Sequence, residues 1–239
     1  MQPPIIFRQC FDKESSTFTY LIGDATSGEA AIIDPVLNCF DRDFQLINEL
    51  GLKIVWVLDT HVHADHITGA GRWRDHTGAK TAISAGAGVD CTDRALCDGD
   101  LIQIGDTTIR AISTPGHTRS CMSYFCAGRV FTGDALLIRG CGRTDFQEGS
   151  SKTLFASVRD KLFALPDETS VYPAHDYRGL TSSTIGEEKR CNPRLGLARS
   201  LADFESLMAS LCLDDPKKMA ESLPANLACG RTVAKTVIL

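Results

Sequence analysis

The stretch Thr60-His61-Val62-His63-Ala64-Asp65-His66 sets three imidazoles and a carboxylate within a few consecutive positions, directly after the apolar run Ile54-Val55-Trp56-Val57-Leu58. Such a run with β-branched members predicts a strand buried on both faces. A rigid strand fixes the backbone there, and the loop beyond its carboxyl end directs side chains into a crevice. A simpler interpretation is a solvated loop whose Asp65 caps a helix beginning near Ile67. Capping is compatible with metal binding but does not account for three histidines, so the pattern predicts a metal site.

Composition and charge exclude several classes of protein. The 239 residues suffice for a sizeable core, and 25 basic against 30 acidic residues give a net charge of −5 without a basic block. We therefore expect no nucleic-acid partner. The apolar runs are too short to cross a bilayer, and the N-terminal stretch Met1–Phe7 lacks a basic region and a secretory apolar segment, so we expect no membrane or export signal. The expected location is the bacterial cytoplasm, or an organelle for a processed form.

The ten cysteines are scattered and include no Cys-x-x-Cys pair. In a chain of this length, that distribution predicts reduced thiols in a cytosol-like compartment, most of them small buried hydrophobes. Cys141, between two glycines, has two interpretations. It either forms a mixed disulfide or guides a sulfur-containing substrate, or it is a small residue packed in a sharp turn.

Apolar runs bounded by turn residues predict strands in both halves of the chain, and apolar stripes predict helices around them. Expected helices begin at Asp41, near Ile67, at Ser150 or Ser151, at a Thr184–Glu187 capping box, and near Leu201. The strands are expected at 5–7, 18–22, 30–33, 54–58, 80–84, 100–105, 107–113, 120–126, 129–132 and 170–172. This order predicts an α/β protein, a four-layer αβ/βα sandwich. Residues 1–180 would form the metal-binding core, and 181–239 a helical extension that packs on the core and covers the site.

Three further strands end in a potential ligand, namely His117, Asp134 and His175. Each alone would more often be a structural residue, and Asp134 after Gly133 fits a simple turn. If the carboxyl ends of the strands align, however, these three converge with the histidine cluster on one crevice. Only His76 is left out, and we expect it on the surface.

These positions resemble the metallo-β-lactamase superfamily, with its His-x-His-x-Asp-His loop, later histidine, bridging aspartate and final histidine. Longer stretches resemble the persulfide dioxygenases within it. They are 60–69, 132–147 (Thr-Gly-Asp-Ala-Leu-Leu-Ile-Arg-Gly-Cys-Gly-Arg-Thr-Asp-Phe-Gln), 172–177, 192–195 and 224–226. The resemblance covers nearly the whole chain and implies the αβ/βα sandwich fold.

The resemblance implies that one Fe(II) per chain is held by His61, His117 and Asp134. Two imidazoles and a carboxylate leave coordination positions open for substrate and dioxygen. Around them, His63, Asp65, His66 and His175 would assist catalysis by orienting ligands, accepting protons and positioning water.

The implied reaction oxidises glutathione persulfide with O₂ and water to sulfite and glutathione, in a homodimer. The two carboxylates of the glutathione portion need cationic partners, because arginine forks match carboxylates. The candidates for substrate binding are Arg139, Arg143, Tyr177 and Arg178. For Arg143 an equal alternative is that it braces its own loop by pairing with Asp145 or with a ligand carboxylate.

Two other functions compete with this hypothesis. A thioester hydrolase resembling glyoxalase II would use the same seven residues to hold two metals that share Asp134 and activate water. Two observations argue against the hydrolase. The sequence of 134–147 resembles the dioxygenases, and the 64 residues that follow His175 are fewer than those of the helical substrate domain in such hydrolases. The other alternative is a non-catalytic metal-binding or thiol-sensing module.

Overall fold

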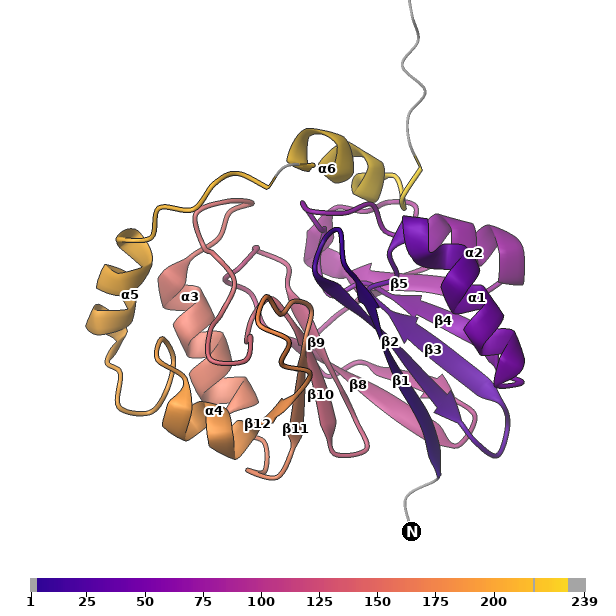
Figure 1. Cartoon of the computed structure of the whole chain (residues 1–239), viewed down its shortest axis with the longest axis horizontal. Helices are drawn as coiled ribbons and strands as arrows, with labels where there is room; N and C mark the ends of the chain where they lie inside the picture. The colour runs from indigo at the N-terminus through magenta and orange to yellow at the C-terminus, as the bar shows by residue number, and fades with distance from the viewer. Residues whose placement is uncertain (1–3, 217, 232–239) are drawn as a thin grey trace, which may run out of the picture.

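Two six-stranded sheets lie face to face in the computed structural model, which describes residues 4–216 and 218–231 (Figure 1). The first has spatial order β1-β2-β3-β4-β5-β6, and the second β12-β11-β10-β9-β8-β7. The first sheet comprises β1 Ile5–Asp12, β2 Thr17–Asp24, β3 Glu29–Ile33, β4 Lys53–Leu58, β5 Lys80–Ser84 and β6 Arg94–Leu96. The second comprises β7 Leu101–Ile104, β8 Thr107–Ser113, β9 Met122–Cys126, β10 Arg129–Gly133, β11 Ser170–Pro173 and β12 Ser183–Thr184.

Helices cover the outer faces, so that the fold has the four layers predicted from the sequence. Figure 1 shows α1 and α2 on the first sheet, α3 to α5 on the second, and α6 at the edge where the sheets open. Their bounds are α1 Phe40–Glu49, α2 Ala70–Thr77, α3 Ser151–Ala156, α4 Ile185–Cys191, α5 Leu201–Ala209 and α6 Met219–Leu227. Helix α3 continues as a π-helical segment over Ser157–Leu162, and short 3₁₀ turns occupy Leu37–Cys39 and Ala85–Ala87.

The core between the sheets fixes the strand ends that carry the site. Tyr20 and Tyr124 are almost fully buried there. The Tyr20 hydroxyl donates a hydrogen bond to the Pro173 carbonyl (2.6 Å), and that of Tyr124 donates to the Asp59 carbonyl (2.8 Å). Buried hydroxyls need such partners. Tyr20 therefore links the first sheet to the last residue of β11, and Tyr124 links the second sheet to the residue directly after β4.

The strands that precede the site run parallel in each sheet. Strands β3 to β6 are mutually parallel, and β10 is parallel to β11. Since carboxyl ends of parallel strands share one edge, the loops after β4, β10 and β11 meet there. The convergence expected from the sequence depends on this arrangement.

Three predicted helix starts were wrong or only partly right. Helix α2 begins at Ala70 after Gly69, so Asp65 does not cap it, and the Asp65 carboxylate instead contacts His66 and Thr17. Helix α1 begins at Phe40, which puts Asp41 inside its first turn. Thr184 caps α4, but the second half of the predicted box is replaced by bonds from Arg139 and Ser183 to the Glu187 carboxylate. Short strands β6 and β12 and helix α6 were not predicted.

The cysteine prediction was wrong for one pair. Cys91 and Cys229, 138 residues apart in sequence, form a disulfide. The other eight cysteines are free. Cys121, Cys126 and Cys141 are buried, but the remaining five are partly or fully exposed, so the expectation that most cysteines are buried was wrong. Spacing along the chain could not reveal the pair, since only the fold brings its two segments together.

In residues 4–216 and 218–231, no helix combines the length and the apolar character needed to cross a bilayer. His76 is exposed, as predicted, with its ring against Phe40 and Phe44. Predictions that involve residues 1–3 and 232–239, the chain start and the end of the extension, lie outside the described residues.

Candidate metal centre

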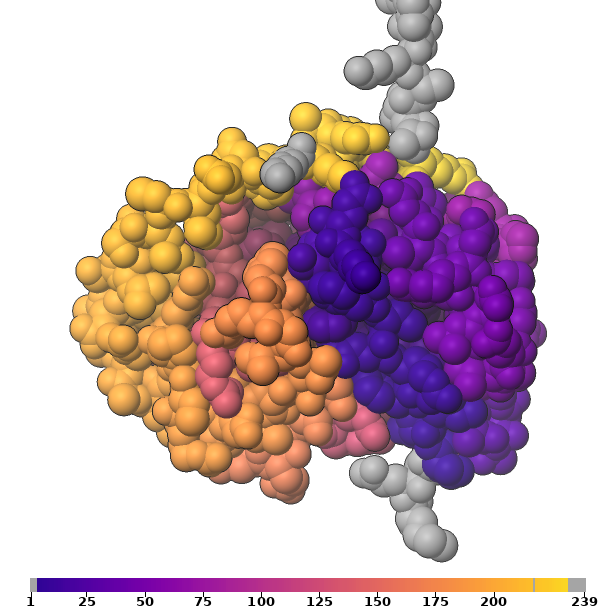
Figure 2. Space-filling model, in the orientation of Figure 1, coloured from indigo at the N-terminus to yellow at the C-terminus, as the bar shows by residue number. Residues whose placement is uncertain are grey.

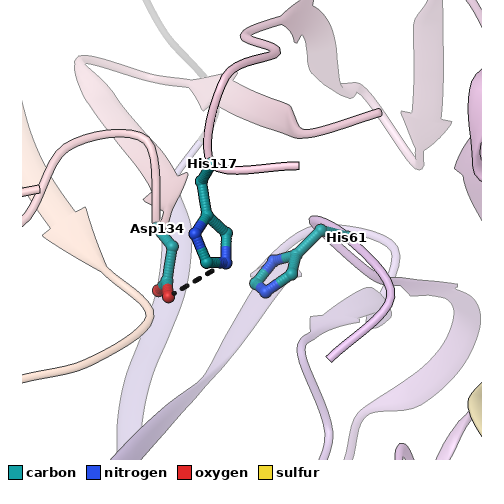
Figure 3. A group of neighbouring side chains, drawn as sticks. All are labelled: His61, His117 and Asp134. Atoms are coloured by element: carbon teal, nitrogen blue, oxygen red, sulfur yellow. Dashed lines mark ion pairs between the residues drawn. The ribbon is translucent and has the colours of Figure 1, made fainter. Parts of the chain in front are cut away.

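His61, His117 and Asp134 come together from three separate strand ends. They lie after β4, after β8 and directly after β10, and each offers a ligand atom within 4.8 Å of the other two. In Figure 3 the three side chains point toward a common centre, and the His117 Nε2 and Asp134 Oδ2 atoms are 3.4 Å apart. Two imidazoles and one carboxylate on one side of a centre match the facial arrangement of mononuclear iron sites.

Hydrogen bonds orient both imidazoles so that Nε2 faces this centre. The Nδ1 of His117 donates to the Arg143 carbonyl (2.7 Å). The Nδ1 of His61 is 3.0 Å from the hydroxyl of Thr60, which itself donates to Asp34 (2.9 Å). Because one ring nitrogen is held by an outer partner, the other is left with its lone pair for a metal.

A second group lies beside the first and consists of His63, Asp65 and His66, whose ligand atoms are also within 4.8 Å of one another. Among the described residues, the Nδ1 of His63, the Nε2 of His66 and the Oδ1 of Asp134 are buried without a hydrogen-bond partner. Orphaned buried polar atoms are costly and need an explanation. Their position at the meeting point of imidazoles and carboxylates fits a bound cation.

Burial sets the charge of these groups. It lowers the pKa of His61 and of His63 well below the ordinary value, helped by neighbouring imidazoles, so both rings are neutral near pH 7. For Asp134, burial acts upward, but the surrounding imidazoles, His175 first, bring its pKa below the ordinary value. Neutral imidazoles and an ionised carboxylate are the forms that bind metals.

His175 closes the site from the end of β11. Its Nδ1 donates to the Ser16 carbonyl (3.1 Å), and its Nε2 lies 3.6 Å from Asp65 Oδ2 and 3.7 Å from Asp134 Oδ1. All seven positions expected to converge therefore lie in one neighbourhood. Their separate roles remain predictions.

A cavity of about 600 Å³ opens over His61, His117 and Asp134. The surface is hollowed beneath the yellow segment that runs from α5 to α6 (Figure 2). The four residues proposed for substrate binding, Arg139, Arg143, Tyr177 and Arg178, all line the cavity, together with Leu213, Asp214 and Pro216 of that segment. The volume suits a small-molecule ligand.

Two of the arginines already have carboxylate partners. The guanidinium of Arg139 contacts the fully buried Glu188 and lies 3.2 Å from Glu187. Arg143 pairs with both oxygens of Asp145 (2.7 and 2.8 Å) and donates to the Asp214 carbonyl (2.7 Å). The bracing alternative for Arg143 is therefore the contact that the structure contains.

Arg178 and Tyr177 are the exposed members of this wall. Arg178 donates to the Ile138 carbonyl (2.6 Å), and the Tyr177 ring stacks on that of His175. Tyr177 is 74% exposed, an unusual position for a large aromatic side chain. Both have free surface toward the cavity.

Sequence reasoning missed Arg194 as a cavity residue. It lines the cavity, and its Nη1 donates to the Cys141 carbonyl (3.0 Å). The one signal was the motif Asn192-Pro193-Arg194-Leu195, which resembles the persulfide dioxygenases but lies outside the segments that carry the metal-ligand candidates.

Cys141 is 3% exposed, and burial raises its pKa to about 11. A thiol in that state is a poor nucleophile near neutral pH. Burial therefore disfavours mixed-disulfide chemistry, although Cys141 lines the cavity, and a role in guiding the persulfide stays a prediction.

Comparison with known proteins agrees with this geometry. The metallo-beta-lactamase superfamily model matches residues 12–175, more than half of the chain. The human mitochondrial persulfide dioxygenase ETHE1 is 48% identical over 230 residues, covering 95% of this chain and 89% of the relative. The crystal structure of ETHE1 from Myxococcus xanthus is 50% identical with a TM-score of 0.92, covering 95% of this chain and all of the other. A metallo-beta-lactamase from Staphylococcus aureus is 26% identical with a TM-score of 0.87, covering 95% and 73%.

A metal-type cluster at the shared edge of two sheets and 48–50% identity over nearly the full length lead to one conclusion. The chain belongs to the metallo-β-lactamase superfamily and, within it, to the persulfide dioxygenase family.

Proposed function

We propose that this protein is an Fe(II)-dependent dioxygenase that oxidises glutathione persulfide with O₂ and water to sulfite and glutathione. The observation that carries the proposal is the group His61, His117 and Asp134 at the floor of the cavity. Its support is the 48% identity to a persulfide dioxygenase over most of the chain.

His61 and His117 would hold one iron per chain through Nε2, and Asp134 through its carboxylate. Bound Fe(II) would supply the one-electron chemistry that lets O₂ react with a persulfide whose electrons are all paired. The Thr60 hydroxyl and the Arg143 carbonyl keep the two rings in the tautomer that this requires.

The surrounding polar groups are suited to handle protons and water. Oxidation of one persulfide by O₂ and water releases sulfite, glutathione and two protons. His175 would accept a proton at Nε2, since its Nδ1 is engaged by Ser16 and Nε2 faces two carboxylates. His63, Asp65 and His66 would orient a water molecule beside the centre.

The cavity wall would bind the glutathione portion. Arg178 and Tyr177 are exposed and would make the direct contacts. Arg139 and Arg143 line the cavity while paired with carboxylates, and would add to its positive charge. Positive charge suits the two carboxylates of the substrate. The apolar stretch formed by Leu137, Ile138 and Leu213 would contact the substrate backbone.

We further propose that 181–239 act as a helical extension on a core of 1–180. Its support is that Arg194, Leu213 and Pro216 line the cavity and that α5 packs on α3. The homodimer implied by the resemblance, and the location in a bacterial cytoplasm or in an organelle after processing, stay predictions. Sedimentation analysis of the purified chain would test the dimer.

An oxygen electrode tests the activity. With glutathione persulfide we expect one O₂ consumed per sulfite formed, and about one iron per chain by metal analysis. Hydrolysis of S-lactoylglutathione serves as the comparison reaction. Thioester turnover without O₂ uptake, or two metals bridged by Asp134 in active protein, would replace the proposal with the hydrolase alternative.

The hydrolase has less support from the relatives, because the persulfide dioxygenases match at 48–50% identity. The group His63, Asp65 and His66 is the observation in its favour, since it offers a second cluster next to Asp134. Metal stoichiometry separates the two.

A further inference from the structure

Helix α6 contacts residues 61–69, which we call the histidine loop, although 163 residues separate Asn226 from His63. The Asn226 side chain is 4% exposed, and its Nδ2 donates to the carbonyl oxygens of both His63 and His66 at 2.8 Å. Its Oδ1 accepts a hydrogen bond from the backbone N–H of Thr68, also at 2.8 Å. One amide group therefore joins three peptide groups of the loop.

These bonds matter because the loop is irregular. Residues 61–69 belong to neither helix nor strand, so their buried carbonyls have no regular ladder partner. Both carbonyls that Asn226 binds flank Asp65. A planar amide that makes three hydrogen bonds has one orientation. It therefore fixes the relative positions of the His63, His66 and Thr68 peptide groups.

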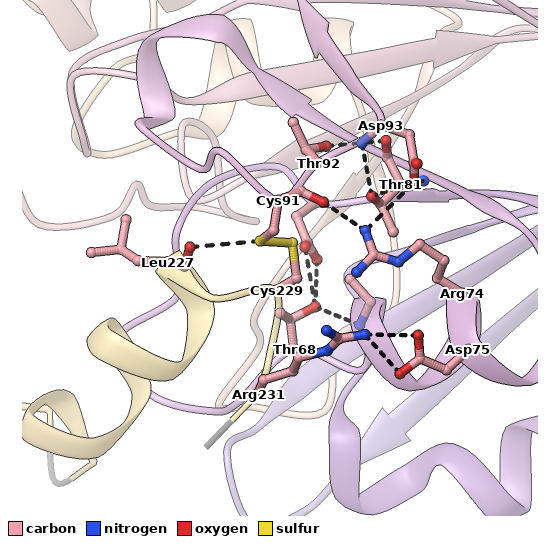
Figure 4. Close-up of a disulfide and its surroundings, with 12 residues drawn as sticks. Thr68, Arg74, Asp75, Thr81, Cys91, Thr92, Asp93, Leu227, Cys229 and Arg231 are labelled. Atoms are coloured by element: carbon pink, nitrogen blue, oxygen red, sulfur yellow. Dashed lines mark hydrogen bonds and ion pairs between the residues drawn. A yellow bond between two sulfur atoms is a disulfide. The ribbon is translucent and has the colours of Figure 1, made fainter. Parts of the chain in front are cut away.

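The disulfide secures the end of this helix. Cys229 follows Asn226 by three positions and is bonded to Cys91, in the loop between β5 and β6 (Figure 4). The Gly71 N–H donates to the Cys229 carbonyl (2.9 Å), and a β-carbon at Gly230 would lie 2.0 Å from the Thr68 carbonyl oxygen. Only glycine allows that approach, and Gly230 also has φ +78°. The segment thus docks on the end of the histidine loop, at Thr68, and on the start of α2, at Gly71.

We propose that Asn226 is a positioning residue for the metal centre and that the Cys91–Cys229 disulfide tethers it there, so that reduction of the disulfide loosens the histidine loop. Two molecules of a low-molecular-weight thiol would supply the electron pair. The S–S bond breaks, two protein thiols form, and the two small thiols leave as their disulfide. The inference rests on the proposed function for its kinetic consequence only.

The first experiment uses the full-length protein without substrate. Deuterium exchange of the 60–69 amides is measured in metal-free protein, and Fe(II) affinity by competition with a chelator. We expect N226A to speed exchange and weaken Fe(II) binding, each by about 10-fold. That is the lower end of the range for groups around a metal site, because Asn226 acts on the centre through the loop that follows His61. N226D keeps an acceptor for Thr68 but loses both donors, and it should weaken Fe(II) binding similarly. Normal Fe(II) affinity and exchange in N226A would overturn the positioning role.

The matched control is S222A on the same helix. Ser222 is fully buried, and its hydroxyl has no partner among the described residues. Its removal should leave exchange and Fe(II) affinity at the wild-type level. An equal effect in S222A and N226A would mean that any disturbance of α6 acts alike, which contradicts a specific role for Asn226.

The second experiment tests the tether. Treating wild-type protein with dithiothreitol, or replacing both cysteines by serine (C91S/C229S), should speed 60–69 exchange by about 3-fold. The double variant should no longer respond to the thiol, whereas C97S, which removes an exposed free cysteine, should respond like wild type. Unchanged exchange after reduction would refute the tether. Absence of O₂ uptake in wild type would refute the proposed function and leave both of these readouts intact.

Discussion

The two walls of the cavity differ in how far the protein satisfies its own polar groups. On the metal side, buried atoms of His63, His66 and Asp134 lack hydrogen-bond partners among the described residues. On the basic side, Arg139 and Arg143 are paired with Glu188 and Asp145. Unsatisfied buried atoms among imidazoles and carboxylates fit cation binding, while paired guanidinium groups indicate a structural role. One cavity can therefore be lined by polar atoms that the protein leaves for a ligand on one side and by polar groups that it satisfies itself on the other.

The largest effect is expected from removing a ligand candidate on the metal side of the cavity. In H117A, the affinity for Fe(II) and the rate of O₂ uptake should both fall by more than about 100-fold. Loss of a ligand has a larger effect than loss of a group that only orients a ligand. The fold should persist, since the sheets do not depend on His117. Metal analysis, the oxygen electrode and circular dichroism measure the three quantities. Iron retained with normal turnover would show that His117 is not a ligand.

Glu188 tests whether the basic side is scaffold. Its carboxylate is fully buried, while the Arg139 side chain is 29% exposed. E188Q should lower the free energy of unfolding by about 2–3 kcal/mol, less than for a fully buried pair because solvent screens Arg139. For a chain of this size the melting temperature should fall by roughly 4–12 °C.

The control is E187Q, at the neighbouring carboxylate on the same arginine, which is 45% exposed. An exposed pair contributes about 0–1 kcal/mol, so the melting temperature should change little. Equal melting temperatures in E188Q and E187Q would be evidence against a buried scaffold pair.

The smallest effects distinguish the arginines from each other. R143A should lower stability by about 1 kcal/mol, since it releases Asp145 and the 213–214 backbone. R178A should lower the melting temperature less than R143A, since it releases only the Ile138 carbonyl, and should raise KM for glutathione persulfide by about 3- to 10-fold, because the exposed guanidinium can contact a substrate carboxylate. Melting curves beside steady-state kinetics decide. A raised KM in R143A without loss of stability would move that residue to the substrate-binding group.

Most of the fold followed from local patterns. Each predicted strand has a counterpart, because alternating or continuous apolar runs between turns have few other ways to bury their side chains. Helix starts were less accurate. Asp65 and Asp41 are good capping residues by type. The Asp65 carboxylate, however, contacts His66, and Asp41 lies inside the first turn of α1 rather than before it.

The candidate site, too, has features that local patterns predicted and features that they did not. The imidazoles and carboxylates could be identified because they follow strands whose shared edge the topology dictates. The partners of Arg139, the cavity position of Arg194 and the contacts of Asn226 could not, since each joins segments about 50 or more residues apart.

The sequence by itself determined that three histidines and an aspartate follow a buried strand, and that three more strand ends carry ligand-type residues. Dense spacing and chain stereochemistry allow that conclusion without any long-range information. Only the tertiary structure decided which arginines are satisfied by buried carboxylates, that Cys91 meets Cys229, and that an amide in α6 supports the histidine loop. Those pairings depend on how distant segments pack, and many alternative pairings are compatible with the same local pattern.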